Sequence, residues 1–305
     1  MRRGGTVCRG LPLRDIRHAM LLREVEYARP ATIEDALRIL ASDPNARALA
    51  GGQTLLNVMK ARAAAPDVLV DLGSLEELRS ISVTAQGGLE VGAMATYSDL
   101  VRSPEVHSTR PVVAEVAGMI ADVQVRNRGT VGGNVCTGDP TNHFPPLMVA
   151  LGATMTVRGA DGERQVPAEE FFLGVYMTAA GPGELLTRIS IPVAGGEGDG
   201  FAIIPIGKDG TAIVLAAACV RVNGTIESAR IALGCVDAVP VRLTSLESGL
   251  AGGKAVESRV RETAKGTAVG LDPPSDVHAA AGYRRHLAEI VAARAVVDAA
   301  GKARR

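Results

Sequence analysis

The chain has neither an excess of one charge nor a long hydrophobic run. Its 33 Lys and Arg residues balance 33 Asp and Glu residues, which argues against nucleic acid or an anionic membrane as a partner. Apolar runs such as residues 213–220 are far shorter than the roughly 20 residues that span a bilayer, so no transmembrane segment is expected. The 4 cysteines form no CxxC pair, and the first residues have no apolar signal-peptide core. Both features indicate a cytoplasmic protein.

Common catalytic and metal-binding motifs are also missing. No GxGxxG follows a predicted strand, and residues 249–255 lack the spacing and the Ser or Thr of a P-loop, so neither a Rossmann domain nor an NTPase is expected. The 5 histidines form no HExxH, and none has a cysteine at metal-ligand spacing. We therefore expect no metal site within this chain. The sequence contains no convincing triad or carboxylate pair, so no catalytic side chain is predicted.

Two glycine-rich segments are the most informative feature that is present. Residues 50–55 have the sequence AGGQTL, and residues 126–134 have the sequence RNRGTVGGN. Each offers backbone N–H groups that side chains do not mask, as a phosphate or pyrophosphate requires where no lysine-bearing phosphate loop exists. A phosphorylated cofactor is therefore the first hypothesis.

Periodicity and turn signals divide the chain into an N-terminal extension and three units. Residues 1–22 are rich in Arg and Gly and aperiodic, so we predict that they are disordered or that translation begins at Met20. Residues 23–84 form a small α/β unit. In it the first glycine segment follows a short buried strand at 46–50 and precedes a helix at 55–64, which Pro66 terminates.

The second unit, residues 85–197, contains a helix capped by Thr96 or Ser98, a helix at 111–120 and then the second glycine segment. The sequence GGEGDG at 195–200 predicts an interdomain linker or a mobile loop. Residues 198–305 form the third unit, where Asn223-Gly224 is a strong hairpin signal. Its predicted strands and helices indicate an antiparallel sheet backed by helices: strands 211–222 and 225–233, and helices 243–250, 256–269 and 276–299.

Residues 24 to about 300 resemble the FAD-binding medium subunit of molybdenum hydroxylases, the family that includes carbon monoxide dehydrogenase and xanthine dehydrogenase. The resemblance is carried by AGGQTLL at 50–56 with MKAR at 59–62, and most specifically by VQVRNRGTVGGN at 123–134. It implies an α+β chain with a two-subdomain vanillyl-alcohol-oxidase (PCMH) type FAD-binding fold and a C-terminal antiparallel sheet with helices. FAD would lie between the two subdomains.

The resemblance also implies which residues bind FAD. These are Ala50, Gly51, Gly52, Gln53, Thr54, Leu55, Thr96, Thr130, Gly132, Gly133, Asn134, Thr137, Asp139, His143 and Lys208. Two positions depart from the family pattern. His143 replaces a usual aspartate, and a surface or helix-start histidine is its alternative interpretation. Ile203 stands where a basic residue is common, so Lys208 either substitutes for that residue or is an exposed lysine at a strand end. Asp139, before Pro140, is compatible with ordinary turn chemistry as well as with cofactor binding.

The function implied is that of an FAD-binding electron-transfer subunit, an oxidoreductase component that passes electrons from iron–sulfur clusters of a partner to an external acceptor. Molybdenum cofactor and iron–sulfur clusters are expected only on partners: a molybdopterin large subunit and an iron–sulfur small subunit, in a dimer of heterotrimers. Two alternatives remain open, a self-sufficient FAD oxidoreductase and a scaffold subunit that has lost flavin. The sequence specifies neither the substrate of the complex nor the acceptor, which could be NAD, a quinone or oxygen.

Overall fold

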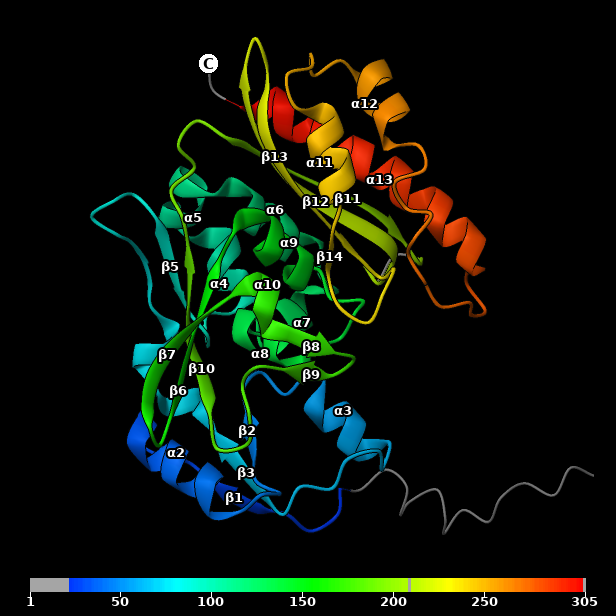
Figure 1. Cartoon of the computed structure of the whole chain (residues 1–305). Helices are drawn as coiled ribbons and strands as arrows, with labels where there is room; N and C mark the ends of the chain where they lie inside the picture. The colour runs from blue at the N-terminus through cyan, green and yellow to red at the C-terminus, as the bar shows by residue number, and fades with distance from the viewer. Residues whose placement is uncertain (1–21, 208–209, 304–305) are drawn as a thin grey trace, which may run out of the picture.

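The computed structural model describes residues 22–207 and 210–303. The predictions for residues 1–21 and for Lys208 therefore lie outside the described residues. The chain forms an N-terminal unit, a larger central unit and a C-terminal sheet covered by helices (Figure 1). No helix within the described ranges combines the length and the apolar composition that crossing a membrane requires.

The N-terminal unit is a parallel sheet with strand order β1-β3-β2. Helix α2 packs its apolar face onto this sheet, and the Thr32 side chain caps its first turn by accepting a hydrogen bond from the N–H of Asp35. The elements are β1 (Glu26–Ala28), α2 (Ile33–Ser42), β2 (Arg47–Leu49), α3 (Leu55–Lys60), β3 (Val68–Asp71) and the 3₁₀ helices η1 (Leu72–Ser74) and η2 (Glu76–Arg79).

Two local predictions in this unit are corrected by the structure. The helix after the first glycine segment ends at Lys60, before Pro66, because Arg62 adopts a left-handed backbone conformation with φ 61°. Strand β2 lies at the predicted place but is only partly buried, since it is an edge strand of a three-stranded sheet. The predicted order of strand, glycine segment and helix is confirmed.

The central unit contains a five-stranded antiparallel sheet with strand order β4-β5-β10-β6-β7. The helices inserted between β5 and β6 carry the second glycine segment, at the start of α8. The sheet strands are β4 (Ile81–Val83), β5 (Leu89–Gly92), β6 (Thr154–Gly159), β7 (Gly162–Pro167) and β10 (Leu185–Ile191). The helices are α4 (Tyr97–Arg102), α5 (Pro104–Thr109), α6 (Pro111–Met119), α7 (Val123–Arg126), α8 (Val131–Thr137), α9 (Phe144–Leu151) and α10 (Ala168–Phe171), and the small hairpin is β8 (Phe172–Gly174) with β9 (Met177–Thr178).

The C-terminal unit is an antiparallel sheet with strand order β11-β12-β13-β14, as the hairpin signal predicted. The long helix α13 crosses one face, while α9 of the central unit lies against the other (Figure 1). The elements are β11 (Gly198–Pro205), β12 (Ala212–Asn223), β13 (Thr225–Gly234), β14 (Val241–Arg242), α11 (Thr244–Leu250), α12 (Glu257–Ala264) and α13 (Ala281–Lys302). Helix α12 is shorter than predicted, since Gly266 turns the chain with φ 77°.

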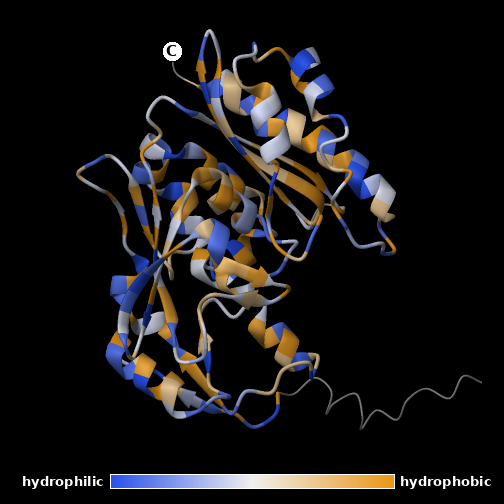
Figure 2. Ribbon diagram, viewed as in Figure 1, coloured by the Kyte–Doolittle hydropathy of each residue, from blue (hydrophilic) through white to orange (hydrophobic). Residues whose placement is uncertain are grey.

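The apolar run at 213–220 is explained by burial of β12 on both faces. Ala216 and Ala218 belong to the core beneath α13, whereas Ala217 and Cys219 belong to the core of the central unit. A strand covered on both sides has a continuous apolar sequence instead of an alternating one. Figure 2 shows the corresponding hydrophobic colouring of the central strands of this sheet.

The prediction of a linker or mobile loop at 195–200 is wrong for its last residues, which begin a strand, whereas residues 195–197 lie outside the helices and strands. Gly198 and Gly200 begin β11 and lie directly under α13. A Cβ on Gly198 would be 2.0 Å from the carbonyl oxygen of Ala299, and one on Gly200 would be 2.1 Å from that of Ala295. These glycines therefore permit close packing of helix on strand, a role that a glycine-rich sequence alone does not distinguish from flexibility.

Candidate functional site

The two glycine segments lie against each other in the structure, although their first residues are 76 positions apart in the sequence. A Cβ on Gly51 would be 2.0 Å from the carbonyl oxygen of Arg128 and 2.8 Å from the Cα of Gly129. Gly133 faces Ala50, whose Cβ is 3.6 Å from the position that a Gly133 Cβ would take. The contact is thus between two backbones, and only glycine at position 51 allows it.

The first glycine segment presents a run of unused backbone donors. Among the described residues, no acceptor receives a hydrogen bond from the N–H groups of residues 51–55. Gly52 has φ 71°, a left-handed conformation that turns the chain between β2 and α3. The side chain of Gln53 donates back to the carbonyl oxygen of Gly51 at 3.0 Å and fixes the turn. Consecutive free amides in such a turn form a concave anion-binding surface.

The second glycine segment is built differently, because its amides, apart from that of Thr130, are already hydrogen-bonded. The N–H groups of Val131 and Gly132 donate to the carbonyls of Ala95 and Ala93, at 3.0 and 2.9 Å. The N–H of Gly133 donates to the Thr130 hydroxyl at 3.1 Å, which caps α8. This segment is therefore a rigid support for the first one. Most of its backbone donors are therefore not available in the way that the sequence suggested for both segments.

Thr96, which the sequence predicted to bind FAD, lies beside this support, and its hydroxyl caps a helix. Residues Thr96 and Thr130 form an isolated antiparallel bridge. The Thr96 hydroxyl accepts from the N–H of Asp99 at 3.1 Å, and the Asp99 carboxylate accepts from the backbone N–H of Thr96 at 3.0 Å, which forms a capping box at the start of α4. Of the two caps that the sequence allowed, Thr96 is the one observed.

Asn134 carries an unsatisfied polar atom in this region. Its side chain is 9% exposed, and its Nδ2 donates to the hydroxyl of Tyr97 at 3.0 Å. Its Oδ1 is buried without a hydrogen-bond partner in the described chain. Buried acceptors of this kind are uncommon in folded proteins and require an explanation, such as a bound group.

Thr137 and Asp139 lie at the far end of α8. The Thr137 hydroxyl donates to the carbonyl of Gly133 at 2.6 Å, so it bonds within the helix. The carboxylate of Asp139 accepts from the N–H and the hydroxyl of Thr141, both at 2.8 Å, which is ordinary turn chemistry. Tyr176, with φ 57°, approaches the same carboxylate at 3.4 Å, and Asp139 raises the pKa of that phenol.

His143 begins α9 but is not a surface residue. Its side chain is 5% exposed and stacks on Phe201 of β11, with ring centroids 6.0 Å apart. Burial lowers its pKa to about 4, although a hydrogen bond with the backbone of Gly210 acts in the opposite direction. The imidazole is therefore neutral and links the central unit to the C-terminal sheet, with Nε2 buried and without a partner among the described residues.

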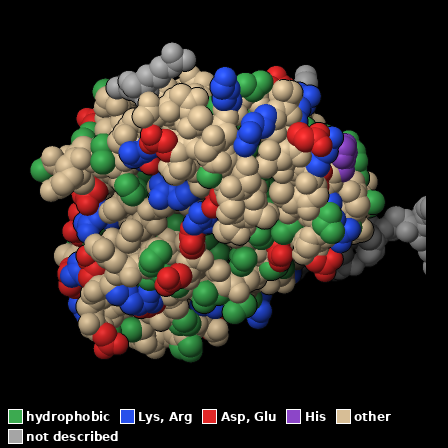
Figure 3. Space-filling view, turned by 45° about the horizontal axis from the view of Figure 1, so that its top comes forward, with side chains coloured by type: hydrophobic (Ala, Val, Ile, Leu, Met, Phe, Trp, Pro, Cys, Tyr) green, Lys and Arg blue, Asp and Glu red, His purple; other side chains and the backbone are tan. Residues whose placement is uncertain are grey.

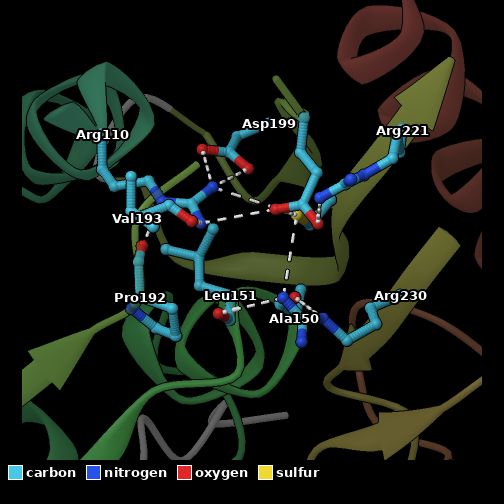
Figure 4. Close-up of polar contacts among 10 residues, drawn as sticks. Arg110, Ala150, Leu151, Pro192, Val193, Asp199, Arg221 and Arg230 are labelled. Carbon is cyan, nitrogen blue, oxygen red and sulfur yellow. Dashed lines mark hydrogen bonds and ion pairs between the residues drawn. The ribbon is translucent and has the colours of Figure 1, made fainter. Parts of the chain in front are cut away.

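A buried cation that sequence reasoning missed joins the same two units (Figure 4). Arg110 is 0% exposed and binds the carboxylate of Asp199 through two hydrogen bonds of 2.8 and 2.9 Å. It also donates to the carbonyls of Pro192 and Val193, at 3.0 and 3.1 Å. The sequence contained no signal for this, since Arg110 precedes a helix-starting proline and Asp199 lies in a glycine-rich run.

A second arginine crosses the interface in the opposite direction. Arg230 of β13 donates to the carbonyls of Ala150 and Leu151 at the end of α9, at 3.1 and 3.3 Å. Positive charge is favourable at a helix C-terminus, where carbonyl groups remain unpaired. Together the two arginines fix how the C-terminal sheet sits on the central unit (Figure 4).

The surface carries no large region of a single charge on the face shown in Figure 3, where acidic and basic side chains alternate. Two surface cavities, of about 140 and 550 Å³, lie near α2 and the β6–β7 hairpin, and none of the predicted cofactor residues lines them. The first glycine segment thus offers backbone N–H groups that can bind an anion, and the chemistry must come from what it binds.

Comparison with known proteins gives consistent matches over almost the whole described chain. A family model described as the FAD binding domain in molybdopterin dehydrogenase matches residues 23–194. A second model, the CO dehydrogenase flavoprotein C-terminal domain, matches residues 200–299. The interval between them contains Asp199, whose carboxylate Arg110 binds.

Individual relatives agree with this. The chain is 35% identical to the carbon monoxide dehydrogenase medium chain of Hydrogenophaga pseudoflava, covering 91% of this chain and 97% of the relative. It is 32% identical to the glyceraldehyde dehydrogenase medium chain of Sulfolobus acidocaldarius, covering 91% and 99%.

Solved structures show the same fold. Carbon monoxide dehydrogenase from Hydrogenophaga pseudoflava superimposes with a TM-score of 0.89 at 34% identity, over 93% of this chain and 100% of that one. Quinoline 2-oxidoreductase from Pseudomonas putida 86 gives a TM-score of 0.88 at 36% identity, over 92% and 99%. This chain therefore belongs to the family of FAD-binding medium subunits of molybdenum hydroxylases, which are oxidoreductase components.

Proposed function

We propose that this chain holds FAD and passes electrons from the iron–sulfur clusters of a partner subunit to an external acceptor. The observation that carries the proposal is the run of unused N–H groups at residues 51–55, pressed against the rigid second glycine segment. A pyrophosphate has about two negative charges, and several backbone donors can stabilise them without a cation. When bound, FAD accepts single electrons and releases them as a pair.

The residues of this chain would divide the binding between them. Residues 50–55 would hold the pyrophosphate through their backbone, and Asn134 would supply a side-chain acceptor through Oδ1. The hydroxyls of Thr96, Thr130 and Thr137 are used in helix hydrogen bonds, so they would shape the site through the backbone. His143 would position the C-terminal sheet through its stack on Phe201.

We propose the vanillyl-alcohol-oxidase type arrangement for this fold, with FAD between the units at 23–84 and 85–197 and the C-terminal domain at 198–305. Contact between the glycine segments, one from each of the first two units, supports this division. The two consecutive family matches, 23–194 and 200–299, support the boundary between the second unit and the C-terminal domain. The pairing of β4 with β5 draws residues 81–83 into the central sheet and moves the first boundary slightly towards the N-terminus.

The partners proposed are a molybdopterin large subunit, where substrate is oxidised, and an iron–sulfur small subunit that relays electrons. Support comes from relatives whose names describe medium chains or subunits of dehydrogenases. A dimer of such three-subunit assemblies is the proposed oligomer.

The test is a visible absorption spectrum of the chain purified with its natural partners, followed by release and identification of the chromophore. Stoichiometric FAD together with iron–sulfur absorption is the expected result. FAD on this chain in the absence of any partner would instead favour a self-sufficient oxidoreductase. Co-purifying partners without flavin would favour a scaffold and refute the proposal.

A Gly133→Val variant tests the location of the site. Its Cβ would lie 2.9 Å from the Thr130 hydroxyl and 3.6 Å from the Cβ of Ala50, so the branched side chain would separate the two segments. We expect flavin loss with a folded chain. Gly301→Val is the matched control, since no atom lies within 4 Å of a Cβ there. Normal flavin content in a folded Gly133→Val protein would contradict the assignment of this segment.

A further inference from the structure

Tyr97 lies against the second glycine segment and contacts it at Gly129 and at Asn134. Its backbone N–H donates to the carbonyl of Gly129 at 3.0 Å. Its ring lies so close to Gly129 that a Cβ there would be 2.6 Å from Cε2. Its hydroxyl accepts the hydrogen bond from Asn134 Nδ2 at 3.0 Å. One side chain thus spans the segment from residue 129 to residue 134.

The ring of Tyr97 is itself held in place. It is 5% exposed and stacks on Phe144 of α9, with centroids 5.9 Å apart and planes 12° from parallel. Burial raises the pKa of the phenol to about 12, so the hydroxyl remains neutral throughout the physiological range. The hydrogen bond to Asn134 therefore does not change with pH, and the ring is a rigid reference point for the segment.

The contact with Tyr97 holds the Asn134 side chain in place. Nδ2 is directed to the phenol, so Oδ1 is the amide atom left without a partner among the described residues, and it is buried. A phenol hydroxyl anchors one end of an amide by a hydrogen bond and leaves the other end for a ligand. Tyr97 therefore fixes where Asn134 lies, and Oδ1 is the end that the structure leaves unpaired.

We propose that Tyr97 is a positioning residue for the cofactor: it holds the Asn134 side chain in place so that Oδ1, the amide end left unpaired, accepts a hydrogen bond from a donor group of FAD. This inference rests on the proposed function. It goes further by assigning the role of Tyr97 to its hydroxyl and by stating that this role operates through Asn134. If Tyr97 served only to fill the core, its ring would be sufficient for that role, and FAD affinity would not depend on its hydroxyl.

A double-mutant cycle separates these roles. Tyr97→Phe keeps the ring and removes the hydroxyl, and Asn134→Ala removes the amide. FAD dissociation constants are measured by flavin fluorescence on the full chain in its complex, for the wild type, both single variants and the double variant. We expect each single variant to bind FAD about tenfold more weakly, the factor typical of one lost hydrogen bond with a partner left unsatisfied. The double variant should bind no more weakly than Asn134→Ala alone.

The matched control is Tyr27→Phe, which also removes a phenol hydroxyl bonded to a side chain, that of Asp71, but on exposed strand β1. It should leave FAD affinity unchanged. Thermal unfolding of each apoprotein tests for general destabilisation, and a Tyr97→Phe protein with wild-type stability and weakened FAD binding is the expected result. Unchanged affinity in Tyr97→Phe, or additive effects in the double variant, would overturn the inference. Absence of FAD from the wild type would instead overturn the proposed function.

Discussion

Replacement of Asp199 by asparagine removes the charge that neutralises a fully buried arginine between two structural units. Arg110 is 0% exposed, and both oxygens of Asp199 accept hydrogen bonds from its Nη1 (Figure 4). The remaining nitrogens donate to the carbonyls of Pro192 and Val193. The variant retains one acceptor oxygen but leaves the guanidinium without its closest counter-ion.

The expected cost follows from burial. Removing one partner of a buried ion pair typically destabilises a protein by about 3–5 kcal/mol, because a charge remains in a region of low dielectric. Glu197 lies 3.6 Å from Arg110 and is only 17% exposed, so part of the charge stays compensated. We therefore expect a loss of roughly 2–4 kcal/mol in the free energy of unfolding.

The assay is urea denaturation followed by circular dichroism, since the chain contains no tryptophan for fluorescence. Glu115→Gln is the matched control. Glu115 also joins the central unit to the C-terminal one, through Lys302 at 2.9 Å, but both side chains are about two-fifths exposed. Exposed pairs contribute about 0–1 kcal/mol. A loss in Asp199→Asn no larger than that in Glu115→Gln would refute the argument that burial gives this pair its importance.

Three further results are expected. Gly51→Ala should abolish flavin retention, because its Cβ would be 2.0 Å from the carbonyl oxygen of Arg128, whereas Gly282→Ala, with open space around it, should retain flavin. His143, with a pKa of about 4 when folded against 6.5 for an unperturbed histidine, takes up its proton more readily when the chain unfolds. Stability should therefore fall by roughly 3 kcal/mol more between pH 7 and 4 in the wild type than in His143→Gln, as measured by urea midpoints. Cys219 and Cys235, whose pKa values burial raises to about 12, should resist maleimide until the chain unfolds; peptide mass spectrometry showing rapid labelling of the native protein would contradict this.

Sequence patterns predicted most elements because local rules determine them. The hairpin of β12 and β13 follows from Asn223-Gly224, and the cap of α4 from Thr96. The failures lie where longer-range contacts override local preference. Gly198 and Gly200 have the composition of a flexible linker, yet α13 buries them as the first residues of a strand.

The candidate site also combines features that local sequence determines with features that longer-range contacts determine. The first glycine segment was recognisable because free amides and a left-handed turn depend on a few consecutive residues. The second segment was recognised as part of the site, but its role as a support was not, since its amides bond to Ala93 and Ala95 more than 30 residues earlier in the chain. The involvement of Tyr97 was missed for the same reason.

The amino-acid sequence by itself determined the family, the three-unit order and the residues that form the two glycine segments, because these depend on local composition and on motifs along the chain. Only the tertiary structure decided that Gly51 contacts Arg128, that Asn134 donates a hydrogen bond to Tyr97 and that Arg110 joins the units through Asp199. Such contacts depend on side chains brought together from distant positions, where burial removes water and so makes an unpaired polar group costly. That cost cannot be read along the chain, because it arises only when the chain is folded.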